Sequence, residues 1–404
     1  MIRSFHVFLA LLLAVFSVGA AKAGKIVVSG CGVGSYDPTL KLMPLKPGLL
    51  TLVNVYCLTL PSSSSPPRPS PDKNNTFVFD SIRGLYLAQA GATSTVHHFD
   101  GRVTAVQNGS FAWSGDSRSV FGVRQETAKP SGHALGPIKP FLFRIDGTQE
   151  KLTELTNPAG PLDEIYWVGH AGIAIAAFGT KGRYYRPEHP DPHPTIAFVD
   201  ARAGRILQSM AIARVPGLDA KSIILGIASG LDSRGNPYAL IALAPYNWVL
   251  WVQGQTPRLV PIHVKPSVMP AFALSPGGKS VLVMENLSAT GVICERDPKC
   301  PAPTPQNGPI AGLHELPSGK LLWTLDGTAK TFSRSNVPAV SPDGRFALVS
   351  TPTGTIALLS MRNGAVLHEI PKPWTDECAM GFSSDGRKVW ISGGSTLVFY
   401  KLEP

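Results

Sequence analysis

The sequence predicts an all-β protein, a seven-bladed β-propeller of four-stranded antiparallel blades that an N-terminal strand closes. The clearest observation is a repeated phrase, Ser-Pro-Asp-Gly-Arg at residues 341–345 and Ser-Ser-Asp-Gly-Arg at residues 383–387, each followed by an alternating apolar run. Such a phrase predicts a β-hairpin, because glycine accepts the positive φ of a tight turn. The positions of Gly344 and Gly386 differ by 42. A period of about 40–45 residues made of strands and turns is typical of a propeller blade.

The number of blades follows from two alternating kinds of hairpin. Weaker copies of the phrase extend it to seven inner hairpins, with turns at residues 81–84, 114–118, 169–172, 232–235, 275–279, 341–345 and 383–387. A second phrase, two apolar strands around a glycine-containing turn, gives six outer hairpins at residues 99–103, 145–148, 199–206, 252–254, 316–321 and 361–366. Inner hairpins join the first two strands of a blade, and outer hairpins join the last two. Trp248 and Trp251 flank a short expected loop, so the sequence does not predict whether their side chains are buried.

Seven inner and six outer hairpins leave the last blade one strand short. After the seventh inner hairpin the sequence has one more apolar run, residues 395–402. An open strand edge there would invite aggregation. We therefore expect the N-terminal segment, residues 24–60, to supply the missing strand, either Lys25–Ser29 or Leu49–Leu58. An eighth, irregular blade built from residues 25–60 is the alternative.

The N-terminus has the features of an export signal. Arg3 precedes the apolar stretch Val7–Val18, and Ala21-Lys22-Ala23 has the small-residue pattern of a cleavage site. The stretch is shorter than the roughly 20 residues of a membrane span. We expect a signal peptide over residues 1–23 and a periplasmic or secreted protein without a membrane span. The Pro- and Ser-rich residues 61–75 predict an extended linker to a propeller over residues 76–404.

The five cysteines of an exported chain predict disulfides and one remaining thiol. Cys294 and Cys300 are expected to pair and close a small surface loop. Cys31 and Cys57 then pair within the N-terminal segment and leave Cys378, or Cys57 pairs with Cys378 and joins the two ends of the chain. The backbone geometry decides between these alternatives.

The net charge indicates which kinds of partner the protein favours. The net charge is +10 and becomes +8 when Arg3 and Lys22 leave with the signal peptide. In an exported protein this excess favours acidic polymers, phospholipid surfaces or other anionic partners over nucleic acid. Solubility alone also accounts for a charge of this size. We expect a monomer whose partner is a protein or an anionic ligand.

The repeated phrase, the β run after it and the glycine hairpin that follows resemble the WD40-like and YVTN-type seven-bladed propellers of exported bacterial proteins. The resemblance covers residues 76–404 and is sharpest in the last three blades. The Trp-Asp dipeptide of WD40 repeats does not occur in the sequence. The resemblance implies the propeller architecture but no particular activity.

Three long insertions indicate where this propeller would bind a partner. They are Gln125–Pro140 in the second blade, Thr180–Pro194 in the third and Glu285–Pro309 in the fifth. All three are expected between the second and third strands of a blade. Because neighbouring strands alternate in direction, these connections leave the propeller on one face. Loops on a rigid scaffold commonly carry binding residues, so this face is the predicted working surface.

The insertion in the third blade has the richest composition. Arginine and aromatic residues are typical of interface hot spots. Its histidines and Asp191 also have metal-ligating side chains, but a metal site needs three or four convergent ligands, and the interspersed prolines favour a solvated loop. No metal site is predicted. The candidate binding residues are Arg183, Tyr184, Tyr185, Arg186, His189 and His193, with His133 from the neighbouring insertion.

No catalytic residue or cofactor is predicted. No serine has glycines two residues before and two residues after it, so a nucleophile elbow is excluded. His314-Glu315 and His368-Glu369 fall in expected strands and lack the second histidine of a zinc-protease helix. The sequence favours a non-enzymatic binding protein. The alternative is a propeller enzyme, either a lactonase-like hydrolase or a quinoprotein-like oxidoreductase, with its site at the central channel.

Overall fold

The protein is all-β with almost no helix, as its sequence predicts. A computed structural model describes residues 27–29, 49–57, 85–90, 93–98, 103–107, 111–113, 119–125, 140–146, 149–154, 162–168, 172–178, 194–218, 222, 224–244, 247–264, 271–284, 306–329, 337–351, 354–371, 378–383, 385–393 and 396–403. These residues form 28 strands and one 3₁₀ helix, η3 (Ile212–Arg214).

Five of the sheets contain four consecutive antiparallel strands each. They are β6 (Phe111–Trp113), β7 (Ser119–Gln125), β8 (Pro140–Asp146) and β9 (Gln149–Glu154); β10 (Leu162–Val168), β11 (Ile173–Phe178), β12 (Thr195–Asp200) and β13 (Arg205–Ala211); β14 (Ile224–Leu231), β15 (Pro237–Leu243), β16 (Asn247–Val252) and β17 (Arg258–Val260); β18 (Ala271–Leu274), β19 (Ser280–Met284), β20 (Gln306–Glu315) and β21 (Leu321–Ala329); β22 (Ala339–Val340), β23 (Phe346–Ser350), β24 (Thr355–Ser360) and β25 (Val366–Pro371). The predicted four-stranded antiparallel sheets are thus confirmed.

The two remaining sheets do not consist of four consecutive strands. One consists of β3 (Leu85–Ala90), β4 (Thr93–His98) and β5 (Val103–Gln107). The other has the order β1 (Val27–Ser29), β2 (Leu50–Cys57), β28 (Thr396–Leu402), β27 (Lys388–Gly393) and β26 (Cys378–Phe382). The strand expected over residues 77–79, before β3, lies outside the described residues.

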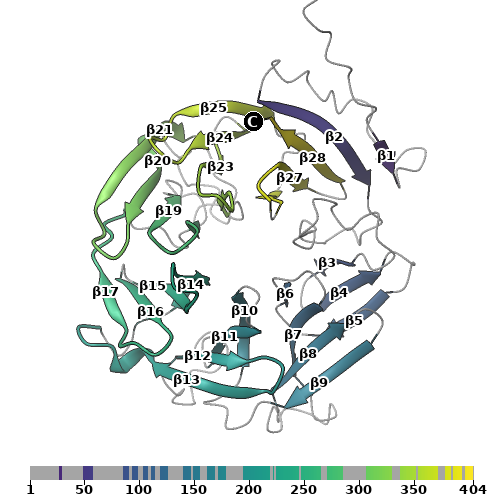
Figure 1. Cartoon of the computed structure of the whole chain (residues 1–404), viewed down its shortest axis with the longest axis vertical. Coiled ribbons are helices and arrows are strands. Elements are labelled where there is room, and N and C mark those ends of the chain that lie inside the picture. Colours follow the sequence, from purple (N-terminus) through teal and green to yellow (C-terminus); the bar gives the residue numbers. More distant parts are fainter. Residues whose placement is uncertain are drawn as a thin grey trace, which may run out of the picture.

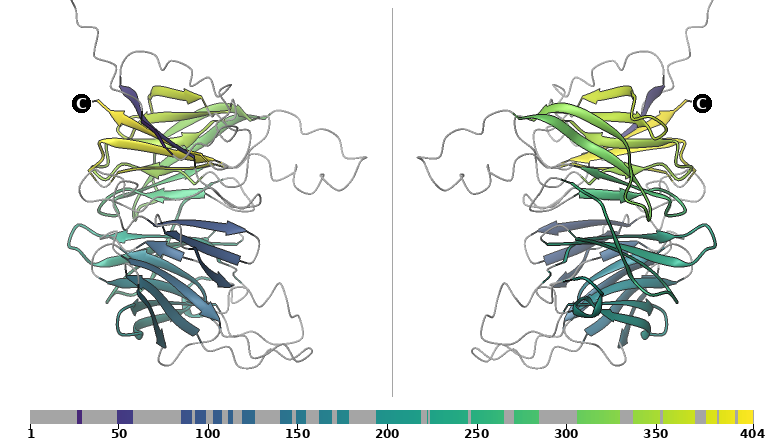
Figure 2. Two further views of the ribbon diagram at one scale, coloured as in Figure 1. Left: turned by 90° about the vertical axis from the view of Figure 1, so that its right-hand side faces the viewer. Right: turned by 90° about the vertical axis from the view of Figure 1, so that its left-hand side faces the viewer.

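The seven sheets lie around a common centre in chain order (Figure 1). The first strands of successive sheets contact one another, from β6 to β10, β14, β18, β22 and β26. In the sheets of consecutive strands the later strands lie progressively farther out, and in the last sheet β2 and β1 lie outside β28 (Figure 1). In the side views the strands run across the thickness of the molecule, so their connections emerge at its two faces (Figure 2).

The apolar cores lie between neighbouring sheets, because successive side chains of a strand point to opposite faces. In β15 every residue is buried. Ile241 packs with Phe198 and Trp251 between the β10–β13 and β14–β17 sheets. Its neighbour Leu240 packs with Val281 on the other face. This two-sided burial explains the continuous apolar run at this strand, which differs from the alternating pattern of a half-exposed strand.

An N-terminal strand extends the last sheet, as the count of hairpins predicts. Of the two candidate segments, the later one pairs with the C-terminal strand: β2 runs antiparallel to β28, with Leu50 opposite Leu402. The earlier segment forms β1, which adds outside β2 in parallel, with Ser29 opposite Tyr56. Both segments therefore join one sheet, so an eighth, irregular blade is not found among the described strands.

The register of this sheet excludes a bond between Cys57 and Cys378. Cys57 lies opposite Thr396, which lies opposite Gly393, which in turn lies opposite Cys378. The two cysteines are thus at the same end of the sheet but three strand spacings apart. At about 4.8 Å each, these spacings separate the Cα atoms by about 14 Å, twice the roughly 7 Å limit of a disulfide.

We expect Cys57 to pair with Cys31 instead. Cys31 lies outside the described residues, but only Gly30 separates it from Ser29, which is opposite Tyr56, the neighbour of Cys57. Peptide mapping of the protein without reduction is expected to give one peptide pair that joins residues 31 and 57, and another that joins Cys294 to Cys300. A cross-link from residue 57 to residue 378 would contradict the strand register.

Candidate functional site

The lengths of the connections divide the strand ends into two groups. Connections from first to second strand and from third to fourth strand contain at most five residues, for example residues 341–345 between β22 and β23. From β3 to β28, every connection longer than five residues joins a second strand to a third, or leaves a fourth strand for the next sheet. Strand alternation places these longer connections at the opposite end of their sheets from the tight turns.

The three predicted insertions fall at the end with the long connections. Residues 126–139 join β7 to β8, residues 179–194 join β11 to β12, and residues 285–305 join β19 to β20. In each case these are the second and third strands of the sheet, as the sequence predicts. Three boundaries are wrong. The third insertion was expected to end at Pro309, but Gln306–Pro309 belong to β20, where they pair with β21. The expected ends of the first insertion, Gln125 and Pro140, are the last residue of β7 and the first residue of β8.

The candidate binding residues themselves lie outside the described residues. This applies to Arg183, Tyr184, Tyr185, Arg186, His189, His193, His133, Cys294 and Cys300. The strands that bear their loops are described, and in the β10–β13 sheet they are rigidly anchored. Phe178, the last residue of β11, is 1% exposed, and Thr195, the first residue of β12, lies opposite it in the ladder.

The tight turns at the other end are held by a repeated side-chain network. Ser341 Oγ donates a hydrogen bond to Asp343 Oδ1 (2.7 Å) and accepts one from the Phe346 N–H (2.9 Å). Asp343 Oδ1 also accepts the Arg345 N–H (3.0 Å), and Gly344 takes a φ of 70°. Partial burial alone would raise the pKa of Asp343, but these hydrogen bonds and the Arg345 guanidinium hold it below its ordinary value.

These turns stack on one another from sheet to sheet. Asp232 forms a parallel bridge with Gly277 of the next sheet. A Cβ on Gly344 would lie 3.6 Å from Pro276, and one on Gly386 would lie 3.7 Å from Pro342. The tight turns of the four sheets from β14 to β28 therefore lie at the same face. Their long connections share the opposite face as a consequence.

The outer turns repeat a second contact between neighbouring sheets. The Gly254 N–H donates to Gln208 Oε1 of the preceding sheet (2.7 Å). Gly319 lies directly against the Pro261 carbonyl, and a Cβ on Gly364 would lie 2.7 Å from the Trp323 ring. Glycine suits these turns for two reasons. It adopts a positive φ, and it has no Cβ where the chain at the fourth strand of the preceding sheet approaches closely.

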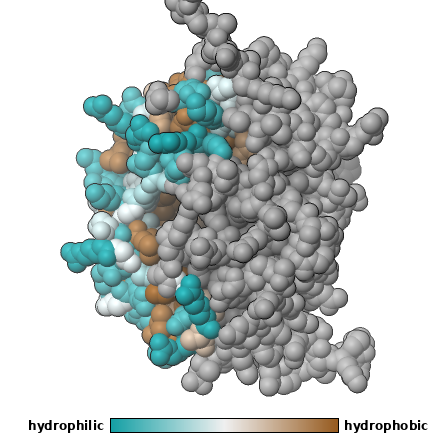
Figure 3. Space-filling view, turned by 45° about the vertical axis from the view of Figure 1, so that its right-hand side comes forward, coloured by the Kyte–Doolittle hydropathy of each residue, from teal (hydrophilic) through white to brown (hydrophobic). Residues whose placement is uncertain are grey.

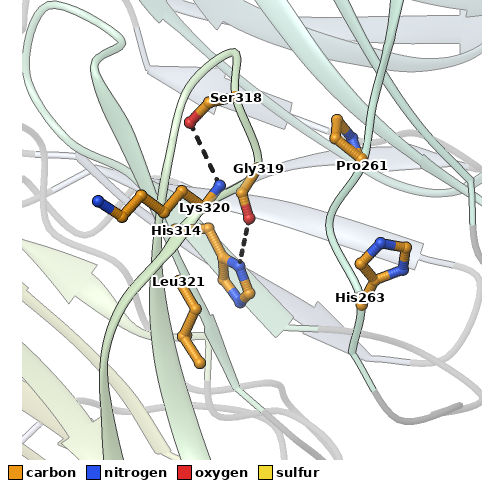
Figure 4. A pocket seen from close by; sticks show the side chains of 7 residues that line it. All are labelled: Pro261, His263, His314, Ser318, Gly319, Lys320 and Leu321. Carbon is orange, nitrogen blue, oxygen red and sulfur yellow. Dashed lines mark hydrogen bonds between the residues drawn. The ribbon is translucent and has the colours of Figure 1, made fainter.

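A cleft of about 410 Å³ lies beside one of these outer contacts (Figure 4). Its walls are the β20–β21 turn and the segment after β17, and the rings of His263 and His314 lie on opposite sides of the gap (Figure 4). The lining residues are Pro261, His263, His314, Ser318, Gly319, Lys320 and Leu321. The cleft thus lies between a third-to-fourth-strand turn of the β18–β21 sheet and the connection that leaves β17, the fourth strand of the preceding sheet.

His314 is the most constrained side chain of the cleft. It is 4% exposed, and its Nδ1 lies 3.2 Å from the Gly319 carbonyl oxygen. A carbonyl only accepts, so Nδ1 carries the proton and Nε2 carries the lone pair. Burial lowers the pKa of His314, and the nearby His263 adds to this, although the Gly319 carbonyl acts in the opposite direction. The ring is therefore neutral at pH 7.

We expect His314 to make the fold less stable in acid. Because its pKa is lower in the folded chain, the unfolded chain binds the proton first as the pH falls through about 6.5. The stability that His314 contributes is therefore complete above this pH. It decreases as the pH falls towards the lower pKa that His314 has in the folded chain. In His314→Asn, whose amide can still donate to Gly319, the free energy of unfolding should change less between about pH 7.5 and pH 5.5 than in the wild type.

Denaturant titrations at the two pH values measure this difference. His263→Asn is the matched control, because His263 lines the same cleft but is exposed. An equal pH dependence in the wild type and His314→Asn would contradict a buried, neutral His314.

The cleft brings two imidazoles together, those of His263 and His314. Two imidazoles are fewer than the three or four ligands of a protein metal site. Among the residues whose placement is described, no group of three or more His, Cys, Asp or Glu could hold a metal ion. Sequence reasoning missed this cleft, because the β17–β18 connection and the β20–β21 turn are far apart in the chain and neither carries a binding motif.

Comparison with known proteins adds no relative: no family model matches the chain, and no match was found among curated proteins. Within the described part of the chain, no helix is long and apolar enough to cross a membrane.

Proposed function

We propose that this chain is an exported, non-enzymatic seven-bladed β-propeller that binds a protein or another ligand through the face of its long connections. The single observation that carries the proposal is the division of the connections. From β3 to β28, every connection longer than five residues leaves from the strand ends opposite the tight turns, and all three long insertions are among them.

The propeller architecture is supported by contacts that repeat from sheet to sheet. First strands meet at the centre, and the tight turns and the outer turns each contact the preceding sheet in the same way. A repeated step of this kind turns the chain around an axis. The pairing of β2 with β28 then completes the last blade with a strand from the N-terminal segment.

In this proposal residues 77–79 are the first strand of the first blade and bring its number of strands to four. With that strand, β3, β4 and β5 become the second, third and fourth strands, in agreement with the inner turn expected at residues 81–84. Seven blades of four strands result, and β1 is an additional strand outside the last one.

Binding at the long-connection face follows from the rigidity of the scaffold and the composition of the loops. The strands that bear the insertion of residues 179–194 are buried, so its two ends leave from fixed positions in the sheet. Its arginines and tyrosines suit the surface of a protein or an anionic ligand. The positive net charge supports the same class of partner.

A loop-exchange variant tests this function. Residues 126–139, 179–194 and 285–305 are each replaced by residues 351–354, the short connection at the same strand step of the β22–β25 sheet. The exchange removes Cys294 and Cys300 together and leaves no new unpaired thiol. Wild type and variant then serve as bait for extracts of the exported compartment, and the variant is expected to lose the captured partners.

A matched control changes the opposite face. Arg234→Glu with Lys320→Glu alters two exposed cations at the tight-turn end and should leave capture intact. Should the loop-exchange variant, with a normal thermal transition, retain every partner, the binding face is wrong. A purified protein that carries a metal or a visible absorption band would instead favour the enzyme alternative.

A further inference from the structure

We propose that two copies of this chain associate edge to edge, by antiparallel pairing of β21 with its counterpart in the second copy. The outermost strand of an open sheet carries unpaired N–H and C=O groups and is a template for another strand. β21 is such a strand, and its sequence is complementary to itself. This interface replaces the monomer that the sequence alone leads us to expect.

The outer edge of β21 is long and apolar. β21 contains nine residues, and among the described strands it pairs only with β20. Leu321 is 49% exposed and Leu322 is 48% exposed, the highest values among the large exposed apolar residues. On the face drawn in Figure 3, the apolar patches of the coloured surface lie among hydrophilic residues. A long exposed apolar edge of this kind favours pairing with another strand.

The other outermost strands are shorter or carry protection against such pairing. Charged residues and proline commonly block strand edges. β17 has three residues including Arg258, β5 has five, β13 contains Arg205, β9 contains Glu150, Lys151 and Glu154, and β25 contains Glu369 and Pro371. By contrast, β21 contains no lysine, arginine or proline, and Asp326 is its single charge.

The last sheet provides a precedent within the chain. There β1 adds to the outer edge of β2, so that edge is already occupied. A fifth strand is therefore compatible with the outer edge of a sheet in this architecture. For the β18–β21 sheet, the described residues contain no corresponding strand.

A two-fold axis through Leu325 gives the pairing in which all nine residues overlap. In this register Thr324 lies opposite Asp326 of the second copy, and the hydroxyl can donate to the carboxylate. Both side chains are exposed in the single chain. Trp323 lies opposite Gly327 in the same register. Leu325 lies opposite itself.

Registers displaced by two residues are less favourable. An axis through Asp326 would place the two Asp326 carboxylates opposite each other, and like charges in that position destabilise a sheet. An axis through Thr324 would place Asp326 opposite Leu322, where the carboxylate finds no donor. Since Asp326 is the only charged residue of the strand, it selects the register through Leu325.

Sedimentation velocity and light scattering of the exported protein, over about a hundredfold range of concentration, measure the association. The wild type is expected to shift from monomer to dimer with increasing concentration. Thr324→Asp places two like-charged pairs across the axis and should weaken the dimer by about tenfold. Thr324→Lys places two opposite-charged pairs there and should strengthen it by a similar factor.

The double variant Thr324→Asp with Asp326→Lys restores opposite charges and should recover the association. Leu367→Lys, an exposed position on β25, is the control and should leave the dimer unchanged. Thermal transitions of all variants establish that each is folded. A wild type that remains monomeric throughout, or a dimer that responds equally to Thr324→Asp and Thr324→Lys, would overturn the β21 interface.

Discussion

A chain that lacks residues 24–60 is expected to lose cooperative folding. β2 pairs with β28 along its length, and its removal leaves β28 without a partner on that side. It would also expose Val398, Tyr400 and Leu402, which are 1%, 4% and 7% exposed and pack with Leu50. Exposure of each large side chain costs about 1.5–3 kcal/mol. The total approaches the roughly 5–15 kcal/mol by which a typical domain is stable.

Circular dichroism and denaturant titration measure this loss. A shorter deletion, residues 24–48, removes β1 but keeps β2 and is the matched control, for which we expect a cooperative transition with a modestly lower midpoint. A synthetic peptide of residues 49–58, added to the longer deletion, should restore part of the transition by supplying β2 in trans. An unchanged midpoint in the longer deletion would show that β2 does not support the last sheet.

Trp251→Ala is expected to lower the free energy of unfolding by about 3–5 kcal/mol, the usual cost of removing a large buried aromatic ring. Trp251 is 1% exposed, and its ring centroid lies 4.4 Å from that of Phe198 in the neighbouring sheet. Its Nε1–H donates to the Gln255 carbonyl (3.2 Å). The substitution therefore leaves a cavity between two sheets and removes a hydrogen bond.

Denaturant titration of the variant gives this value directly. Leu259→Ala is the control, because Leu259 lies on the outermost strand of the same sheet and is 40% exposed. It should change the free energy of unfolding by about 0.5 kcal/mol or less. A loss below about 1 kcal/mol for Trp251→Ala would mean that the β10–β13 and β14–β17 sheets do not share a close-packed core.

The turns could be predicted from the sequence because their geometry is local. Gly344 and Gly386 have φ of 70°, and the serine and aspartate before them satisfy the turn within five residues. The six outer hairpins were found for the same reason. Strand order within the sheets followed from the alternation of these two turns and required no long-range information.

Features that depend on contacts between distant segments could not be predicted in the same way. Both candidate segments near the N-terminus have apolar strand patterns, and only the pairing with β28 distinguishes Leu50–Cys57. The excluded bond between Cys57 and Cys378 depends on the same register. Trp248 and Trp251 do not flank a loop but belong to one strand, β16, whose two faces are covered by different sheets.

The candidate sites also divide into features that follow from the local sequence and features that depend on contacts between distant segments. The positions of the three insertions follow from counting strands, so sequence reasoning placed them between second and third strands. The cleft required Gly319 and Pro261 to meet, and these residues belong to neighbouring sheets. The complementarity of β21 with itself became meaningful only once the structure placed that strand at the outer edge.

The arrangement of the blades around one axis is tested most directly by distances between spin labels, introduced through an unnatural amino acid. One label at Asn363 is paired in turn with labels at Ser318, Gln255 and Arg202, exposed positions in the outer turns of successively earlier sheets, and with one at Thr104 in β5. A closed propeller predicts that the distance rises from Ser318 to Arg202 and falls again at Thr104. A distance that continues to rise to Thr104 would mean an open array and would contradict the account.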